Sequence, residues 1–187
     1  YMAGTALGHW MQENWQGNFD YVVVLQYVHV AQLPAARIYG QIEGLETVLG
    51  KLPDNKLMTI NGGANKTTFK EATLTAFSAI PASSRVAILS FNDNATMGAL
   101  WATRELNREG NTVIVGQGAD HIVRSEICRD DSPIIGATAF WPERYGERLI
   151  EIALDILNGV SVPPAVYINH VFLDRHNISQ YYPDDGC

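Results

Sequence analysis

Polar side chains stand directly after three apolar runs of the chain, at places where they could bind a small ligand. These side chains are Asn61 after LMTI, Asn92 and Asp93 after AILSF, and Gln117 and Asp120 after VIVG. An amide offers two donors and an acceptor, and a carboxylate accepts hydrogen bonds, so this set can pair with the neighbouring hydroxyl groups of a ligand. The chemistry that these residues favour is the binding of a small hydroxylated molecule.

Aromatic residues close to the same positions could complete such a site. Phe91, Phe140 and Trp141 lie near the ends of the apolar runs. An aromatic ring can stack on the apolar face of a sugar, but each of these rings is equally compatible with packing in the core. The aromatic residues therefore agree with a sugar site without requiring one.

The junction Asn92–Asn94 also has a purely local interpretation. Asn and Asp are preferred caps at the start of a helix, and Asp93 or Asn94 could cap a helix that starts near Ala95. In that case the three residues only turn the chain from strand to helix.

The elements that must position these residues alternate along the chain. Apolar runs predict strands at 21–28, 57–60, 85–90, 112–116 and 133–140, and helical patterns occupy 2–16, 35–51, 66–80, 95–109, 120–129 and 142–159. A final extended segment covers 165–173. Repeated strand–helix units predict an α/β fold, with a doubly wound, mostly parallel sheet and helices on both faces. The carboxyl ends of parallel strands share one edge, where ligands bind in such sheets.

Composition excludes several classes of protein. The chain has 187 residues, a net charge of −7 and 13 scattered basic residues, which disfavours nucleic acid as a partner. No apolar run is long enough to span a bilayer. The two cysteines, Cys128 and Cys187, form no zinc-ligand pattern, and they could make one disulfide or none.

Signals for catalysis are weak. The chain has no GxSxG, HExxH or P-loop motif, and VGQGAD at 115–120 contains a lone GxG. None of the five histidines (His9, His29, His121, His170 and His176) lies in a recognisable nucleophile motif. We therefore expect no catalytic residue, no metal and no cofactor, although a triad built from distant residues stays open as an alternative.

Four segments carry a resemblance to a known family. FNDNATMGALWATRE (91–105) is similar to the NDxxAxGAxxA segment of type I periplasmic binding proteins, and VIVGQGAD (113–120) takes the place of their next strand and turn. AARIYGQIEGLETVL (35–49) and PERYGERLIEIALDILNG (142–159) resemble an earlier and a late helix of that family. The segments occur in the expected order over nearly the whole chain.

The resemblance implies two α/β lobes joined by three crossovers, with the ligand between them. Residues 1–138 would be most of the carboxyl-terminal lobe, 139–163 a crossover helix belonging to the amino-terminal lobe, and 164–187 a return strand and tail. The amphipathic start of the chain has no preceding strand or cap, so we expect most of the amino-terminal lobe to be missing before Tyr1. We also expect exposed apolar surface on the helix at 143–158 unless it repacks or dimerises.

The resemblance also implies roles for individual residues. Arg37 would lie where sugar-binding relatives place an arginine against ligand hydroxyls, and Asn92 would match their ligand-binding asparagine. Two departures speak against a typical ribose or galactose pocket: an acidic residue of the family aligns with Gly118, and a glutamine aligns near Phe140. A surface ion pair or helix capping is the alternative for Arg37. The candidate ligand-binding set is Arg37, Asn61, Asn92, Asp93, Gln117, Asp120 and Phe140.

The function that the resemblance implies is a non-catalytic receptor for a sugar or sugar-like ligand of a bacterial ABC importer. Its partners would be the carbohydrate and a membrane permease, and its location would be periplasmic or lipid-anchored outside the cytoplasm. The alternative is the effector-binding core of a lactose-repressor-type regulator. Such regulators often carry VPxDISVxGFDD, whereas REGNTVIVGQGAD (108–120) lacks the proline, which favours the receptor. An enzyme with distant catalytic residues is a third hypothesis.

Overall fold

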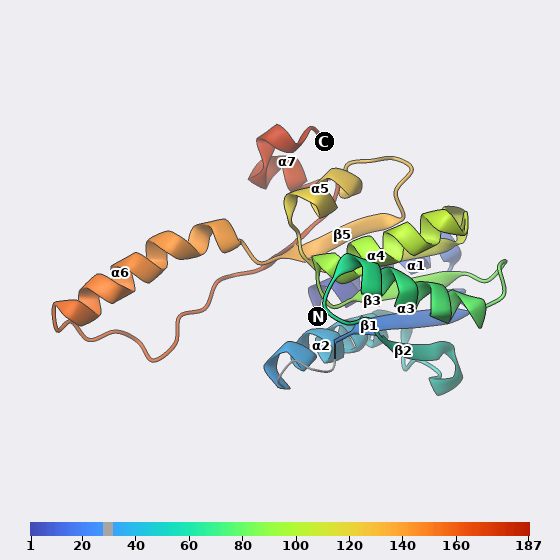
Figure 1. Cartoon of the computed structure of the whole chain (residues 1–187), viewed down its shortest axis with the longest axis horizontal. Helices are drawn as coiled ribbons and strands as arrows, with labels where there is room; N and C mark the ends of the chain where they lie inside the picture. The colour runs from blue at the N-terminus through green and yellow to red at the C-terminus, as the bar shows by residue number, and fades with distance from the viewer. Residues whose placement is uncertain (28–31) are drawn as a thin grey trace.

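A twisted sheet forms the centre of the chain (Figure 1). The computed structural model describes residues 1–27 and 32–187, and within them six strands form one sheet in the order β2-β1-β3-β4-β5-β6. The strands are β1 (Tyr21–Gln26), β2 (Leu57–Asn61), β3 (Val86–Ser90), β4 (Thr112–Gly118), β5 (Ile134–Ala139) and β6 (Val171–Leu173). Strands β1 to β5 pair in parallel and β6 pairs antiparallel to β5. The predicted α/β fold with a mostly parallel sheet is confirmed; Val28 and His29 lie outside the described residues.

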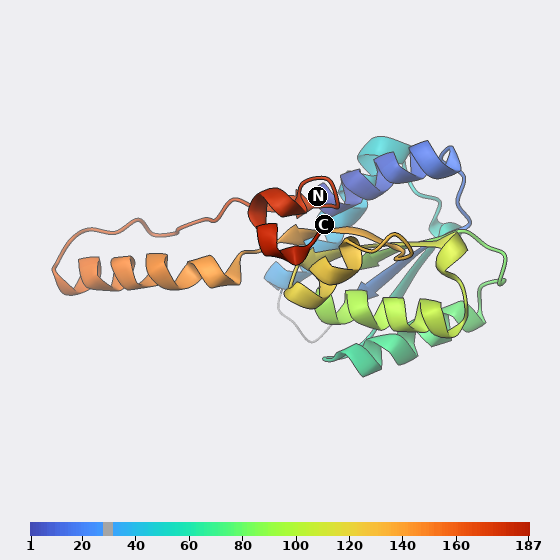
Figure 2. The same cartoon turned by 90° about the horizontal axis from the view of Figure 1, so that it is seen from above.

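Helices cover both faces of the sheet (Figure 2). They are α1 (Met2–Trp15), α2 (Gln32–Leu49), α3 (Lys66–Ser78), α4 (Asp93–Glu105), α5 (His121–Ile127), α6 (Tyr145–Leu157) and α7 (Ile178–Tyr181). Helices α1 and α2 lie on one face and α3 and α4 on the other. A Cβ on Gly4 of α1 would lie 1.8 Å from the carbonyl oxygen of Gln41 on α2, so glycine permits the close approach of these two helices.

Burial on both faces explains the unbroken apolar runs of the central strands. Every residue of β3 is buried, and β4 is buried from Thr112 to Gln117. The edge strand β2, in contrast, is partly exposed along its length. A parallel strand covered by helices on both sides needs apolar side chains in both directions, which is the pattern that the sequence shows.

Helix α6 projects from the body of the molecule, and the chain returns beside it without strand structure until β6 (Figures 1 and 2). Its apolar side chains are exposed; they include Leu149, Ile150, Leu154, Ile156 and Leu157, the last with an exposed fraction of 81%. The expected exposed apolar surface on this helix is confirmed. None of the helices in the described part of the chain is long and apolar enough to cross a membrane.

Three local expectations need correction or completion. Helix α4 begins at Asp93 rather than near Ala95, and Asn92 is its cap. The extended segment predicted at 165–173 contributes only the three residues of β6, because the preceding residues run beside α6 away from the sheet. The tail folds into α7 and a short 3₁₀ turn (Pro183–Asp185), and Cys128 and Cys187 form a disulfide.

Candidate ligand-binding site

Arg37 lies at the carboxyl-terminal edge of the sheet, between two aromatic rings. Its guanidinium carbon is 5.3 Å from the ring centre of Phe91 and 4.5 Å from that of Phe140. A cation over an aromatic face is attracted by the negative charge density of the ring, so the two rings help to hold the guanidinium in place. Burial lowers the pKa of Arg37 from its usual value, while Tyr145 and Asp93 oppose that shift.

Gln117 holds the backbone of α2 against the end of β4. Its side chain is 5% exposed, and its amide nitrogen donates a hydrogen bond of 3.0 Å to the carbonyl oxygen of Arg37. No described residue donates a hydrogen bond to the amide oxygen of Gln117, so this oxygen can accept one from a ligand. The structure thus brings together Arg37 of α2, Gln117 of β4 and Phe140, which follows β5; their contact with a ligand stays a prediction.

A cavity of about 430 Å³ opens at these three residues. Its other lining residues are Tyr1, Met2, Ala36, Thr138, Tyr145 and His170. The ring of His170 lies 5.0 Å from that of Phe140. Cavities of a few hundred Å³ are of the size that small ligands occupy.

Sequence reasoning missed Thr138, Tyr145 and His170 as lining residues. Thr138 precedes Phe140 by two positions, and the alternation of side chains along a strand could have placed it on the same side. Tyr145 is the first residue of α6 and His170 directly precedes β6. The path of these two segments relative to the sheet cannot be read from a periodic pattern in the sequence.

Asp93 joins the turns that follow β3 and β4. Its carboxylate accepts hydrogen bonds from the backbone N–H groups of Ala119, at 2.9 Å, and Asp120, at 3.3 Å. Burial, with the negative charge of Asp120 as a second cause, raises the pKa of Asp93 to about 7. A Cβ on Gly118, whose φ is +125°, would lie 1.9 Å from a carboxylate oxygen of Asp93. Glycine at this position therefore makes the contact between the two turns possible.

The remaining predicted residues lie around the edge without lining the cavity. The side-chain oxygen of Asn92 accepts from the Ala95 N–H at 2.9 Å, and that of Asp120 accepts from the Val123 N–H at 3.0 Å. Both residues are helix caps, which is the local interpretation of such positions. Asn61 is exposed at the end of β2. Contact of Asn61, Asn92, Asp93 and Asp120 with a ligand stays a prediction.

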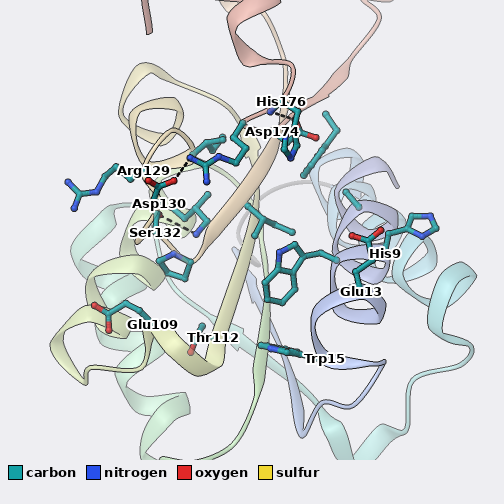
Figure 3. Close-up of a pocket in the computed structure, with 18 of the residues that line it drawn as sticks. His9, Glu13, Trp15, Glu109, Thr112, Arg129, Asp130, Ser132, Asp174 and His176 are labelled. Atoms are coloured by element: carbon teal, nitrogen blue, oxygen red, sulfur yellow. Dashed lines mark hydrogen bonds and ion pairs between the residues drawn. The ribbon is translucent and has the colours of Figure 1, made fainter. Parts of the chain in front are cut away.

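A second cavity, of about 550 Å³, lies at the opposite edge of the sheet (Figure 3). His9 and Glu13 of α1 stand on one side of it, and Arg129 and Asp130 on the other. Three of its charged lining groups are in ion pairs: Asp130 pairs with Arg175 at 2.7 Å, and Arg129 pairs at 2.8 Å with Asp131, which lies outside the lining. Charges that are neutralised in this way are less available to a ligand than the guanidinium of Arg37.

Known proteins share this fold. Residues 1–161 match the family described as periplasmic binding protein domain. The chain belongs to this family. No curated protein matches the chain in sequence.

Solved structures of other proteins superpose on this periplasmic binding protein domain over nearly the whole length of the chain. An ABC transporter solute-binding protein from Actinobacillus succinogenes 130z, with bound D-allose, superposes with a TM-score of 0.75 at 16% identity, covering 96% of this chain and 61% of that one. A galactofuranose-binding protein gives 0.79 at 14% identity, covering 98% and 62%. A solute-binding protein from Bacillus halodurans C-125, with bound myo-inositol, gives 0.75 at 11% identity, covering 96% and 60%.

These superpositions show a common fold, and the coverage shows that the solved structures are longer than this chain. The periplasmic binding protein domain described here spans about three fifths of the length of those solved structures. The match in fold includes α6 and the return to β6, since 96% or more of this chain is covered in each of the three.

Proposed function

We propose that the protein is a non-catalytic receptor that binds a sugar or sugar-like solute for a bacterial ABC importer. The observation that carries this proposal is the convergence of Arg37, Gln117 and Phe140 on one cavity at the carboxyl edge of the sheet. Membership of a binding-protein family supports it, as do the sugar and polyol ligands of proteins with the same fold.

The three side chains offer complementary contacts to a sugar. The guanidinium of Arg37 has several N–H donors for ring hydroxyl groups, and the amide oxygen of Gln117 is an acceptor. The ring of Phe140 provides an apolar surface on which the C–H face of a sugar can stack. Because every hydroxyl is both donor and acceptor, this mixture suits a polyol better than a simple anion.

A second α/β lobe would complete the receptor. We propose that residues 1–138 form the carboxyl-terminal lobe, that the crossover 139–163 places α6 on the other lobe, and that 164–187 return to the first. The exposed apolar side chains of α6 support this division, because a surface helix of a folded protein normally buries such a stripe. The greater length of the structures with the same fold supports it as well.

The proposed mechanism is closure of the two lobes around the ligand. A ligand that contacts both lobes binds the closed form more tightly and shifts the equilibrium toward it. A membrane permease that recognises the closed form would then receive the solute, and no bond of the ligand would be broken.

The disulfide favours this receptor over the regulator hypothesis. Cys128 and Cys187 are bonded, and disulfides persist in oxidising compartments but are rare in the cytoplasm. A lactose-repressor-type regulator works in the cytoplasm, on DNA. We therefore propose a periplasmic or lipid-anchored extracytoplasmic location. Cell fractionation tests this: the full-length protein is expected in the envelope or periplasmic fraction, and a cytoplasmic location with DNA binding would favour the regulator.

Calorimetric titration of the full-length protein with a panel of monosaccharides and polyols tests the binding function. At least one of them is expected to bind and to be recovered unchanged. Arg37→Ala is expected to weaken that binding by about 10- to 100-fold, because hydrogen bonds from a charged group are lost. Arg129→Ala, at the opposite edge of the sheet, is the matched control and is expected to bind normally. The absence of binding throughout the panel, or conversion of a bound sugar into product, would contradict the proposal.

A further inference from the structure

The carboxyl-terminal segment, residues 174–187, folds back onto the lobe beside α5 (Figure 1). This segment, which we call the strap, follows the residues 1–161 that match the family, and most of it is covered in the superposition with the galactofuranose-binding protein. Its last residue, Cys187, is bonded to Cys128 at the end of α5. Ile178 in the strap is fully buried, so the contact is more than a surface attachment.

Arg124 of α5 is the centre of the contact with the strap. It forms an ion pair with Asp185, and the two side chains are only 12% and 8% exposed. The ring of Tyr182 lies against the same guanidinium, with 3.5 Å between the guanidinium carbon and the ring centre. An ion pair removed from water in this way is strongly coupled to its partners, since loss of one leaves the other charge buried.

The same guanidinium also reaches the turn that follows Gln117 at the end of β4. Its Nη1 donates a hydrogen bond of 3.0 Å to the carbonyl oxygen of Ala119. On the other side of that residue, the N–H of Ala119 donates to Asp93. Ala119 has a φ of +63°, which a residue with a side chain adopts only when its surroundings hold it there. Arg124 and Asp93 hold it from opposite sides.

The strap contacts the base of the α6 arm as well. The indole of Trp141 is stacked against Tyr182, with 5.6 Å between ring centres, and its N–H donates to the carbonyl oxygen of Asn169 at 3.1 Å. The hydroxyl of Tyr182 donates to Glu143 at 2.6 Å. Trp141 and Glu143 belong to the outgoing segment and Asn169 to the returning one, so the strap contacts the outgoing connection directly and the returning one through Trp141.

We propose that the disulfide-locked strap positions the turn 118–120, next to the candidate site, and the base of the α6 arm, with Arg124 as the positioning residue that carries its effect to the turn. Gln117, which lines the cavity, directly precedes this turn. The part of the inference that concerns ligand affinity rests on the proposed sugar-binding function. The part that concerns the order of the turn does not.

The test compares Arg124→Gln with Arg104→Gln in the full-length protein. Arg104 is a matched control because it also makes a two-bond ion pair to α5, with Glu126, at 3.0 and 2.7 Å, but contacts neither the strap nor the turn. Hydrogen exchange of the Ala119 and Asp120 amides is measured well below the melting temperature. Exchange is expected to be at least about tenfold faster in Arg124→Gln than in the control, because the local opening of the turn becomes easier.

A second pair of variants tests the lock. The double change Cys128→Ser with Cys187→Ser releases the end of the strap, and it is expected to speed exchange at the same two amides and to weaken sugar affinity severalfold. Asp185→Asn, which keeps the disulfide, is expected to act in the same direction. Lower melting temperatures with unchanged exchange and unchanged affinity would mean that the strap only stabilises the lobe, and would overturn the inference.

The two proposals fail in different ways. A wild-type protein that binds no member of the sugar panel would contradict the proposed function, while the exchange rates would still decide the role of Arg124. Sugar binding that is normal in Arg124→Gln, with normal exchange at the turn, would contradict the inference and leave the proposed function in place.

Discussion

At the scale of single residues, the polar cluster after β3 serves the backbone. Asn92 caps α4 and Asp93 ties the turn after β4 to the turn after β3. The sequence predicted this cluster correctly at a strand end, because Asn and Asp directly after an apolar run are typical both of helix caps and of ligand-binding positions. It could not choose between these roles, since the choice depends on the backbone N–H groups that a distant turn presents.

Asp93 gives a pH dependence that can be measured. Its pKa is raised to about 7 in the folded chain, well above the value of an exposed carboxyl group. The native state therefore holds this proton more tightly than the unfolded state, and stability falls as the pH rises through about 7. Between pH 5 and pH 8 we expect a loss of about 2 to 3 kcal/mol from this group. Urea unfolding of wild type and Asp93→Asn at several pH values measures it.

The contrast with Asp93→Asn is the control for other titrating groups. The asparagine cannot ionise, so the part of the pH dependence that belongs to Asp93 is expected to vanish. A stability difference between wild type and variant that stays constant from pH 5 to pH 8 would show that Asp93 titrates at its ordinary pKa, and would contradict the prediction.

Gly118 gives a second prediction at the residue scale. Gly118→Ala would force a side chain into a positive φ and against the Asp93 carboxylate. We expect a destabilisation of about 2 to 4 kcal/mol, from strain and from the loss of the two Asp93 hydrogen bonds. Gly110→Ala is the matched control, because its Cβ would meet no atom within 4 Å. Denaturant unfolding of both variants decides the point, and equal stabilities would refute it.

At the scale of elements, the regular part of the lobe was predictable. The continuous apolar runs of β3 and β4 indicate strands buried on both faces, and the intervening patterns indicate helices. The strap was not predictable, because YYPDDGC has no periodicity and its order comes from contacts with α5 and Trp141. The final extended segment was predicted too long for a related reason: apolar residues ahead of β6, such as Val166 and Tyr167, are exposed and pair with no strand.

Helix α6 gives a prediction at this scale. If its apolar stripe packs against a second lobe, Leu154→Asp will place a charge in that interface. We expect the full-length protein to lose about 3 kcal/mol or more, because a buried unpaired charge is costly. Glu151→Ala, on the polar side of the same helix, is expected to change stability by less than about 0.5 kcal/mol. Equal, small effects in thermal unfolding would indicate that the stripe of α6 is exposed in the full-length protein.

At the scale of the whole molecule, the candidate site lies next to the segments that connect the sheet to α6. Arg37, Gln117 and Phe140 face a cavity at the carboxyl edge, and the segments beside that cavity lead to α6 and back. Sequence reasoning reached the family because several segments occur in order along the chain. It could not identify a ligand, because specificity depends on which ligand groups the surfaces around the cavity contact together.

A crystal structure of the full-length protein, with the monosaccharide that binds it most tightly, tests the central claim most directly. We predict that the sugar contacts Arg37 and Gln117 and stacks against Phe140, at the carboxyl edge of the sheet. A sugar bound at the opposite edge, in the cavity between His9 and Arg129, or at a site that involves none of the three residues, would contradict it.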